Sequence, residues 1–540
     1  MADLATTAGT LPAGESLLDR KMKKSHAWIS GAVVVGALLG GLGYIGFHIS
    51  QDLDTITVGS AWPYVLLGVA LLIALGFEFV NGFHDTANAV ATVIYTHSLD
   101  PNIAVVWSGL CNLAGVLVSS GAVAFSVITL LPVELILQVS SGAGFAMVFA
   151  LLIAAIIWNL GTWWFGLPAS SSHTMVGSII GVGVANQLMN VHSGTSGVDW
   201  EQATKVFRVL LISPIIGFGA AALLFLLSKA FIKYPALYQA PKDNTPPPWP
   251  IRALLILTCS GVSFSHGSND GQKGMGLIML ILIGTVPTAY ALNHAVSAKD
   301  VQAFVAASDQ AGQILDKHVD KTGIIGNDAR GEVTDYIRTK ELKPDTILAL
   351  RELVSDLGHE VSLYKEFKAV PAKDQSNVRN DMYVASDAIR LMQKAKNPAF
   401  TASEAAVLAD YRSTVDKATK FIPGWVKVAV ALALGMGTMV GWKRICVTVG
   451  EKIGKEHLTY AQGACAELVA MATISLADNF GLPVSTTHVL SSGVAGTMAA
   501  NKSGLQMSTL RNIAAAWVFT LPAAALLSGS LFWLFRQVAG

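Results

Sequence analysis

One short motif occurs twice in this sequence, and both copies interrupt a long apolar stretch. Gly166–His173 reads GLPASSSH, and Gly481–His488 reads GLPVSTTH. Proline fixes φ and a neighbouring Ser or Thr caps a helix, so each copy predicts a helix start with free backbone N–H groups and hydroxyls at its tip. Such a tip binds anions. Within hydrocarbon, an interruption of this kind persists only where it is buried in protein or lines a cavity.

A second pair of motifs precedes these two. Asn81–Asn88 reads NGFHDTAN, and His266–Lys273 reads HGSNDGQK. The aspartates of this pair, Asp85 and Asp270, lie 185 residues apart, whereas the two hydroxyl motifs lie 315 residues apart. The difference of 130 residues matches a polar stretch at about residues 291–420. The two halves fall nearly into register without this stretch, which predicts an internal duplication with one insertion.

The composition is that of a membrane protein. Of the 540 residues, 52% are hydrophobic and only 14% are charged, and the mean hydropathy is +0.51. A soluble domain carries roughly a quarter charged residues, so the sequence predicts a protein that crosses the membrane many times. The net charge of +1 gives no indication of nucleic-acid binding. The cysteines lie in or beside apolar runs without a paired spacing, which favours buried free thiols over a metal site or disulfide: Cys111, Cys259, Cys446 and Cys465.

The predicted fold is all-α. It is a polytopic transmembrane helical bundle with two inverted-topology repeats, broken helices and a helical extramembrane insert. Because an odd number of membrane crossings separates the corresponding motifs, the second repeat is expected to enter the membrane from the opposite side. This plan is typical of secondary transporters, in which the substrate binds near the midplane of the membrane. Breaks are expected at the aspartate motifs. The predicted apolar helices span 27–49, 62–95, 102–125, 144–165, 170–188, 207–232, 251–292, 423–442, 460–479 and 512–535.

The same patterns divide the chain into segments. Basic clusters at Arg20–Lys24 and Lys443–Lys455 are expected on the cytoplasmic side, which places the insert outside. The predicted segments are an N-terminal tail with an extra transmembrane helix (1–61), repeat 1 (62–232), a Pro-rich linker (233–250), the start of repeat 2 (251–290), the polar helical insert (291–420) and the remainder of repeat 2 (421–540).

Asp85 and Asp270 are the strongest candidates for chemistry. A carboxylate near the middle of a bilayer costs at least about 2.5–3.5 kcal/mol, so it normally faces a partner or a transport pathway. Two carboxylates at matched positions favour a cation or proton site. The alternative is that each aspartate satisfies backbone amides of a broken helix. Neutral oxygens for the coupling ion are expected from the neighbouring asparagines: Asn81, Asn88 and Asn269.

The hydroxyl triplets are candidate anion ligands. Hydroxyls at two facing helix N-termini suit an oxyanion, and the alternative is that they join closely packed helices. The residues concerned are Ser170, Ser171, Ser172, Ser485, Thr486 and Thr487.

Further polar residues in the apolar runs have supporting roles or more than one interpretation. Lys273 is the one basic residue of the motif helices, and it either helps to hold an anion or snorkels to the membrane surface. Glu78 and Glu467 are candidate proton carriers without a counterpart in the other half. The histidines are either satisfied core residues or direct ligands and proton carriers: His84, His173, His266 and His488.

These motifs together resemble the inorganic phosphate transporter (Pit/PiT) family, and most closely its bacterial low-affinity phosphate permeases. The resemblance covers about 62–290 and 421–536. It implies a multi-pass symporter of inorganic phosphate in the bacterial cytoplasmic (inner) membrane, driven by protons, with phosphate often carried as a metal–phosphate complex. It implies no resident cofactor. The expected partners are phosphate and the lipid bilayer, with a homodimer as an option and no nucleic acid.

The resemblance also implies roles for residues. Sodium-coupled relatives use these Asp and Asn positions as cation ligands, which assigns a coupling ion or metal to Asp85 and Asp270 and phosphate to the hydroxyls. The family's usual G-A-N-D motif is not kept in the first half, where His84 precedes Asp85. Protons are therefore the expected coupling ion, and sodium is the alternative. Two functions of a different kind compete with symport, namely a channel and an intramembrane Ser/His hydrolase. The hydrolase is disfavoured because His173 lies next to its serines on one helix, and no enzyme is expected.

Overall fold

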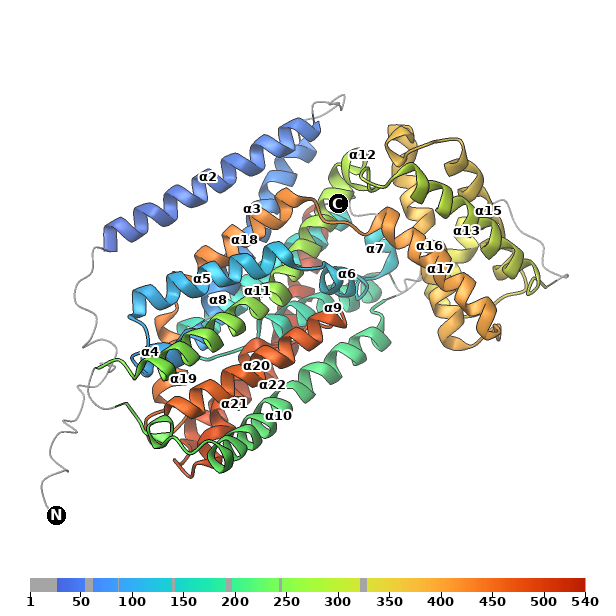
Figure 1. Ribbon diagram of the computed structural model, residues 1–540. Helices are drawn as coiled ribbons and strands as arrows, with labels where there is room; N and C mark the ends of the chain where they lie inside the picture. Colours follow the sequence, from blue (N-terminus) through green and yellow to red (C-terminus); the bar gives the residue numbers. More distant parts are fainter. Residues whose placement is uncertain are drawn as a thin grey trace, which may run out of the picture.

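The computed structural model describes residues 27–53, 62–85, 87–137, 141–190, 197–241, 245–320 and 328–539. Over these ranges the chain is helical, apart from one isolated β-bridge between Gly454 and Leu505. Figure 1 shows a bundle of long helices with a separate group of shorter helices, α13–α17, at one end. The basic cluster Arg20–Lys24 and residue 86 of the first aspartate motif lie outside the described residues.

The first half begins with α2, which lies along the outside of the bundle (Figure 1). The hydroxyl motif separates two antiparallel neighbours, α8 and α9, as the sequence predicts. The helices of this half are α2 (Ala27–Leu53), α3 (Trp62–Asp85), α4 (Ala87–Tyr95), α5 (Pro101–Val118), α6 (Ala122–Ile128), α7 (Val133–Leu137), α8 (Gly142–Trp164), α9 (Ser171–Met189) and α10 (Trp200–Phe231), followed by the 3₁₀ turn η1 (Pro235–Tyr238).

The second half differs from the prediction at the second aspartate motif. The sequence predicts a broken helix over residues 251–292, but α11 (Trp249–Thr285) runs without interruption through Asp270. The glycines around Asp270 do not break it, because they let α11 pack closely on α5, and tertiary packing outweighs the low helix propensity of glycine. The remaining helices are α12 (Pro287–Tyr290), α18 (Gly424–Thr438), α19 (Lys443–Glu451), α20 (Tyr460–Asn479), α21 (Thr486–Ala500) and α22 (Met507–Ala539).

Close helix crossings hold the two halves together. A Cβ atom on Gly267 of α11 would overlap the backbone oxygen of Asn112 on α5, and one on Gly181 of α9 would overlap that of Ala525 on α22. Small residues at membrane-helix interfaces allow this approach of two backbones. Each crossing joins a helix of one half to a helix of the other half, so the halves interdigitate. That they are related by an inverted repeat remains a prediction.

The insert is helical, as predicted, and has its own apolar core. Phe304, Phe367 and Tyr411 pack together in it, with ring centroids 5.9–6.3 Å apart. Its two ends meet, because the Asn293 N–H donates to the Ala418 carbonyl oxygen at 2.8 Å. Its elements are α13 (Ala298–Asp316), α14 (Ala329–Thr339), α15 (Thr346–Ser362), η2 (Phe367–Ala369), α16 (Ala372–Ala395) and α17 (Ala402–Thr419).

Helices with exposed apolar side chains surround two buried helices, α9 and α21. Within the described residues, five helical stretches are long and apolar enough to cross a membrane: Tyr64–Tyr95, Pro101–Val118, Gly142–Trp164, Trp200–Phe231 and Met507–Val538. Helix α10 exposes large apolar side chains such as Phe207, Leu211 and Ile215, which is a lipid-facing surface. By contrast, α9 and α21 are buried along most of their length. The polar tips of α9 and α21 therefore lie inside protein, where a break in a membrane helix is tolerated.

The ends of the bundle differ in charge. Helix α19, with Lys443 and Arg444, lies at the end remote from the insert (Figure 1). From the positive-inside tendency we expect this end to be cytoplasmic, and the placement of the insert outside the cell stays a prediction.

Candidate functional site

The first hydroxyl of each triplet caps its own helix. Ser170 Oγ accepts from the His173 N–H at 3.2 Å, and Ser485 Oγ accepts from the His488 N–H at 3.1 Å. Side-chain caps of this kind stabilise a helix start, and the predicted starts of α9 and α21 are thereby confirmed. Capping uses an acceptor position of Ser170 and Ser485 and leaves the O–H donor of each serine unaffected.

The two helix tips converge on Asp85, which is the last residue of α3 and is buried. Ser171 Oγ of α9 donates to Asp85 Oδ2 at 2.5 Å, and Thr487 Oγ1 of α21 donates to Oδ1 at 2.8 Å. His84 Nδ1 lies 2.9 Å from the same Oδ1. Asp85 therefore meets hydroxyls from both halves of the chain. The alternative that it serves the backbone of its own broken helix finds no support in these side-chain partners.

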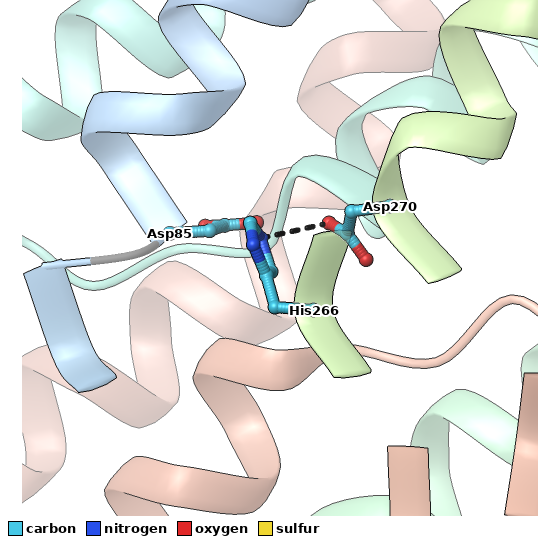
Figure 2. Close-up of side chains that lie close together, drawn as sticks. All are labelled: Asp85, His266 and Asp270. Carbon is cyan, nitrogen blue, oxygen red and sulfur yellow. Dashed lines mark ion pairs between the residues drawn. The ribbon is translucent and has the colours of Figure 1, made fainter. Parts of the chain in front are cut away.

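Asp270 lies across from Asp85, on the middle of α11 (Figure 2). Its Oδ2 forms an ion pair with Lys273 Nζ at 2.7 Å and lies 3.5 Å from His266 Nε2. Ser171 Oγ also reaches this oxygen, at 3.3 Å. One hydroxyl of α9 thus stands between the two predicted carboxylates, which brings both into a single site.

Lys273 is completely buried, so the hypothesis that it snorkels to the membrane surface is wrong. Besides its ion pair with Asp270, its ammonium donates to Ser172 Oγ of the α9 tip. Ser172 Oγ in turn donates to the Val484 carbonyl oxygen at 2.8 Å, just before α21. A buried charge requires a partner of opposite charge and further hydrogen bonds, and Lys273 has both.

Asn88 belongs to the centre of the site. Its Nδ2 donates to the Asp85 carbonyl oxygen at 2.9 Å and to Thr487 Oγ1 at 3.0 Å. Its Oδ1 is buried and has no hydrogen-bond partner among the described residues. It therefore offers a neutral oxygen beside Asp85, as the sequence suggests.

Asn269 and Asn81 form hydrogen bonds with groups other than the two aspartates. Asn269 Nδ2 donates to the Leu482 carbonyl oxygen at 3.1 Å, and its Oδ1 accepts from the Val484 N–H at 3.4 Å. Asn269 therefore fixes the segment that leads into α21. Asn81 Nδ2 donates to Glu78 Oε2 at 3.4 Å, one helical turn before the site. Asn81 Oδ1 is buried and has no hydrogen-bond partner among the described residues, and the roles of Asn81 and Asn269 as ligands of the coupling ion stay predictions.

Two residues that the sequence did not single out orient the predicted histidines. His84 Nε2 lies 3.0 Å from Thr162 Oγ1 of α8, and His266 Nδ1 lies 2.7 Å from Asn112 Oδ1 of α5. These contacts fix the rings so that His84 turns its Nδ1 to Asp85 and His266 turns its Nε2 to Asp270. Thr162 and Asn112 are polar residues within apolar runs, and this position was the sequence signal that could have identified them.

His173 and His488 lie against each other. Their ring centroids are 4.4 Å apart, and His488 also stacks on Trp517 at 4.1 Å. Neither His173 Nδ1 nor His488 Nε2 has a hydrogen-bond partner in the part of the chain that the structure describes. A hydrolase needs a serine hydroxyl bonded to a histidine nitrogen, and no such bond is formed at these nitrogens.

Two further carboxyl groups accept hydrogen bonds within the bundle, and of these Glu467 is buried and Asp478 is partly buried. Asp478, three residues before the second hydroxyl motif, accepts from Ser268 Oγ and Gln272 Nε2, each at 2.6 Å. Sequence reasoning missed it, although a carboxylate next to the motif was a visible signal. Glu467 accepts hydroxyl hydrogen bonds from Thr92 and Thr258 at a distance from the two aspartates.

The cysteines take no part in the site. All four are free, and Cys259, Cys446 and Cys465 are buried while Cys111 is partly so. The prediction of free thiols is therefore confirmed.

Comparison with known proteins identifies the family. Residues 81–528 match the family described as "Phosphate transporter family". This chain belongs to the phosphate transporter family. It is 41% identical to the low-affinity inorganic phosphate transporter PitB of Escherichia coli strain K12, over 88% of this chain and 97% of the relative. PitA of the same strain is 42% identical with the same coverage.

More distant similarity extends over the same region. A probable low-affinity inorganic phosphate transporter of Bacillus subtilis strain 168 is 27% identical, with 88% of this chain and 99% of the relative covered. A solved structure titled "The sodium-dependent phosphate transporter" is 17% identical over 88% of this chain, with a TM-score of 0.47.

The family confirms several expectations about this transporter. It transports phosphate and is not an enzyme, which removes the hydrolase alternative. Its apolar helices and its bacterial relatives agree with the expected multi-pass protein of a bacterial inner membrane.

Proposed function

We propose that this transporter is a proton-coupled phosphate symporter, in which phosphate binds between the tips of α9 and α21 and Asp85 is the coupling group. One observation carries the proposal. Ser171 and Thr487, from two helices that begin in different halves of the chain, both donate to the Asp85 carboxylate. The hydroxyls of both tips therefore reach one oxyanion, and phosphate is an oxyanion of suitable size and charge.

The tips hold further donors for phosphate. Thr486 Oγ1 is buried and has no hydrogen-bond partner among the described residues. Each helix start adds backbone N–H groups and the positive end of its dipole, which favour an anion. Hydrogen bonds to an ionised acceptor are roughly twice as strong as those between neutral groups. Together these groups can replace part of the hydration shell that phosphate loses on entering the protein.

The position of Asp85 supplies a reason for coupling. An ionised Asp85 competes with phosphate for Ser171 and Thr487, and it repels the anion in a poorly screened interior. A proton on Asp85 removes the charge and weakens its hold on both hydroxyls. Proton and phosphate then each bind better when the other is bound, because a coupling free energy between two sites is reciprocal. Only the site loaded with both is then ready to cross by rocking of one half against the other.

Sodium is the alternative coupling ion. A sodium ion at Asp85 needs several oxygen ligands, and Asn88 Oδ1 offers one. However, the Asp85 oxygens already have Ser171, Thr487 and His84 as neighbours within 2.9 Å. A proton needs only one carboxylate oxygen, so this crowded environment favours protons.

A divalent metal carried with phosphate is a further option. Asp85, His266 and Asp270 each offer a ligand atom, and these atoms lie within 4.8 Å of one another. Carboxylate and imidazole ligands suit divalent cations. The ammonium of Lys273 already pairs with Asp270, which reduces the charge available to such a metal.

Reconstituted transport tests the proposal. Proteoliposomes with an imposed pH gradient, a clamped membrane potential and no sodium should accumulate phosphate against its gradient. Uptake that requires a sodium gradient would instead establish the sodium alternative, and flux that only follows the phosphate gradient would establish a channel. Parallel measurements with and without Mg²⁺ determine whether the metal–phosphate complex is the preferred form.

A further inference from the structure

We infer that Lys273 is a fixed cation that neutralises Asp270 in the second half of the chain. The matched residue of the first half, Asn88, is neutral, so Asp85 is neutralised by a mobile cation instead. Asp85 is then the only one of the two central aspartates that takes up a coupling cation during transport. This inference rests on the proposed function and specifies the number of charges that move with phosphate.

The two halves share one contact at matched positions, and the residue that makes it differs in charge. Asn88 follows Asp85 by three residues and donates to Thr487 at the tip of α21. Lys273 follows Asp270 by three residues and donates to Ser172 at the tip of α9. The offsets between the halves, 185 and 315 residues, make Lys273 the counterpart of Asn88 and Ser172 that of Thr487. At matched positions, one half therefore has a neutral amide and the other a positive charge.

The positive charge of Lys273 satisfies Asp270. The two side chains are completely buried, and Lys273 Nζ lies 2.7 Å from Asp270 Oδ2. A further cation bound to Asp270 would stand beside this ammonium, and the repulsion of like charges is strong in a poorly screened interior. Asp270 is therefore neutralised within the protein itself.

Among the described residues, no lysine or arginine forms an ion pair with Asp85. Within the described residues its only basic neighbour in ion-pair range is His84, whose Nδ1 lies 2.9 Å away. Its other side-chain partners are the hydroxyls of Ser171 and Thr487, which are neutral. The negative charge that must be cancelled before phosphate enters is thus the charge of Asp85.

Replacing Lys273 by asparagine makes the second half like the first. Asp270 then lacks its cation, and phosphate binding requires one more mobile proton or sodium ion. The test determines the number of coupled cations in proteoliposomes, with a fixed cation gradient and a clamped membrane potential. The phosphate gradient at which net flux reverses is measured for the wild type and for Lys273→Asn, under proton and sodium gradients in turn.

We expect Lys273→Asn to couple one more cation per phosphate than the wild type. For each tenfold gradient of that cation, the phosphate ratio at reversal should rise by a further factor of about ten, because each tenfold gradient contributes the same free energy. Lys273→Arg keeps a fixed charge and should reverse at the wild-type ratio. An active Lys273→Asn protein that also reverses at the wild-type ratio would overturn the inference.

A second variant covers the case in which Lys273→Asn is inactive. The double variant Lys273→Asn/Asp270→Asn removes both charges and leaves no buried carboxylate without a partner. It should regain uptake and reverse at the wild-type ratio, whereas Asp270→Asn alone, with an unpaired ammonium, should not transport. If Lys273 instead holds phosphate directly, the double variant stays inactive although it melts at the wild-type temperature, and the inference fails.

These outcomes are separate from those of the proposed function. If the wild type itself shows no dependence on the proton gradient, proton coupling is wrong whatever Lys273 does. If the wild type is proton-coupled and an active Lys273→Asn protein reverses at the wild-type phosphate ratio, only the fixed-cation inference is wrong.

Discussion

Truncation of the hydroxyl of Thr486 is the sharpest probe of the anion site. This hydroxyl is buried at the tip of α21 and has no hydrogen-bond partner among the described residues, so Thr486→Ala breaks no such contact within the protein. A hydrogen bond to a charged group contributes about 1.5–3 kcal/mol. The loss corresponds to roughly ten- to a hundred-fold weaker phosphate binding. Binding should weaken without vanishing, because the backbone N–H groups and the helix dipole remain.

Ser171→Ala tests the opposite tip in the same way. Its hydroxyl contacts both Asp85 and Asp270, so the variant removes a donor to phosphate and also changes the surroundings of both carboxylates. If both tips bind one phosphate ion, the effects of Ser171→Ala and Thr486→Ala should not add in the double variant, since residues that share a ligand couple by about 0.5–3 kcal/mol. Phosphate affinity is measured on purified protein, beside the melting temperature.

The chain offers matched controls for these variants. Ser178 lies on α9 and Thr497 lies on α21, both buried, seven residues beyond Ser171 and eleven residues beyond Thr486. Ser178→Ala and Thr497→Ala should leave phosphate affinity unchanged. If Thr486→Ala lowers the melting temperature and leaves the affinity unaltered, its hydroxyl joins helices and the reasoning about the anion site is refuted.

Three further predictions concern coupling, the insert and helix packing. Asp85→Asn keeps the shape of the side chain and removes its charge, so it should abolish proton-driven uptake in correctly inserted protein; near-normal uptake would end the coupling role of Asp85. Deletion of residues 293–419 with a short flexible linker should preserve some uptake, because the Asn293 N–H and the Ala418 oxygen are hydrogen-bonded at 2.8 Å and the ends therefore meet; complete loss despite normal insertion would place the insert in the transport path. Gly267→Ala should lower stability by about 1–3 kcal/mol through overpacking against Asn112, whereas Gly219→Ala on α10, with no atom near its Cβ position, should be tolerated; equal melting temperatures for the two variants would contradict the close α5–α11 crossing.

Several features could be predicted from sequence because their cause is local. Long apolar runs give the spanning helices, and the bounds of α20 agree with the prediction at both ends. The proline and the serines of each hydroxyl motif predict a helix start, and Ser170 and Ser485 cap as expected. The polar insert interrupts an apolar half, and its helical content was also readable. In each case the neighbouring residues supply the physical reason.

The uninterrupted course of α11 was not readable in this way. Glycines beside Asp270 suggest a break by propensity alone, yet Gly267 allows the backbone of α5 to approach, and the resulting packing keeps the helix continuous. Propensity is a weak guide where tertiary contacts decide.

The partners within the site were decided by the tertiary structure alone. The sequence marks Asp85, Ser171 and Thr487 as polar residues in apolar surroundings, but only the folded chain brings hydroxyls from both halves to one carboxylate. The duplication matches Lys273 with Asn88, but only the structure shows that its ammonium pairs with Asp270. The physical reason is the same throughout: a buried polar group must find partners, and the sequence determines that need, while the packing of helices distant along the chain determines which partners satisfy it.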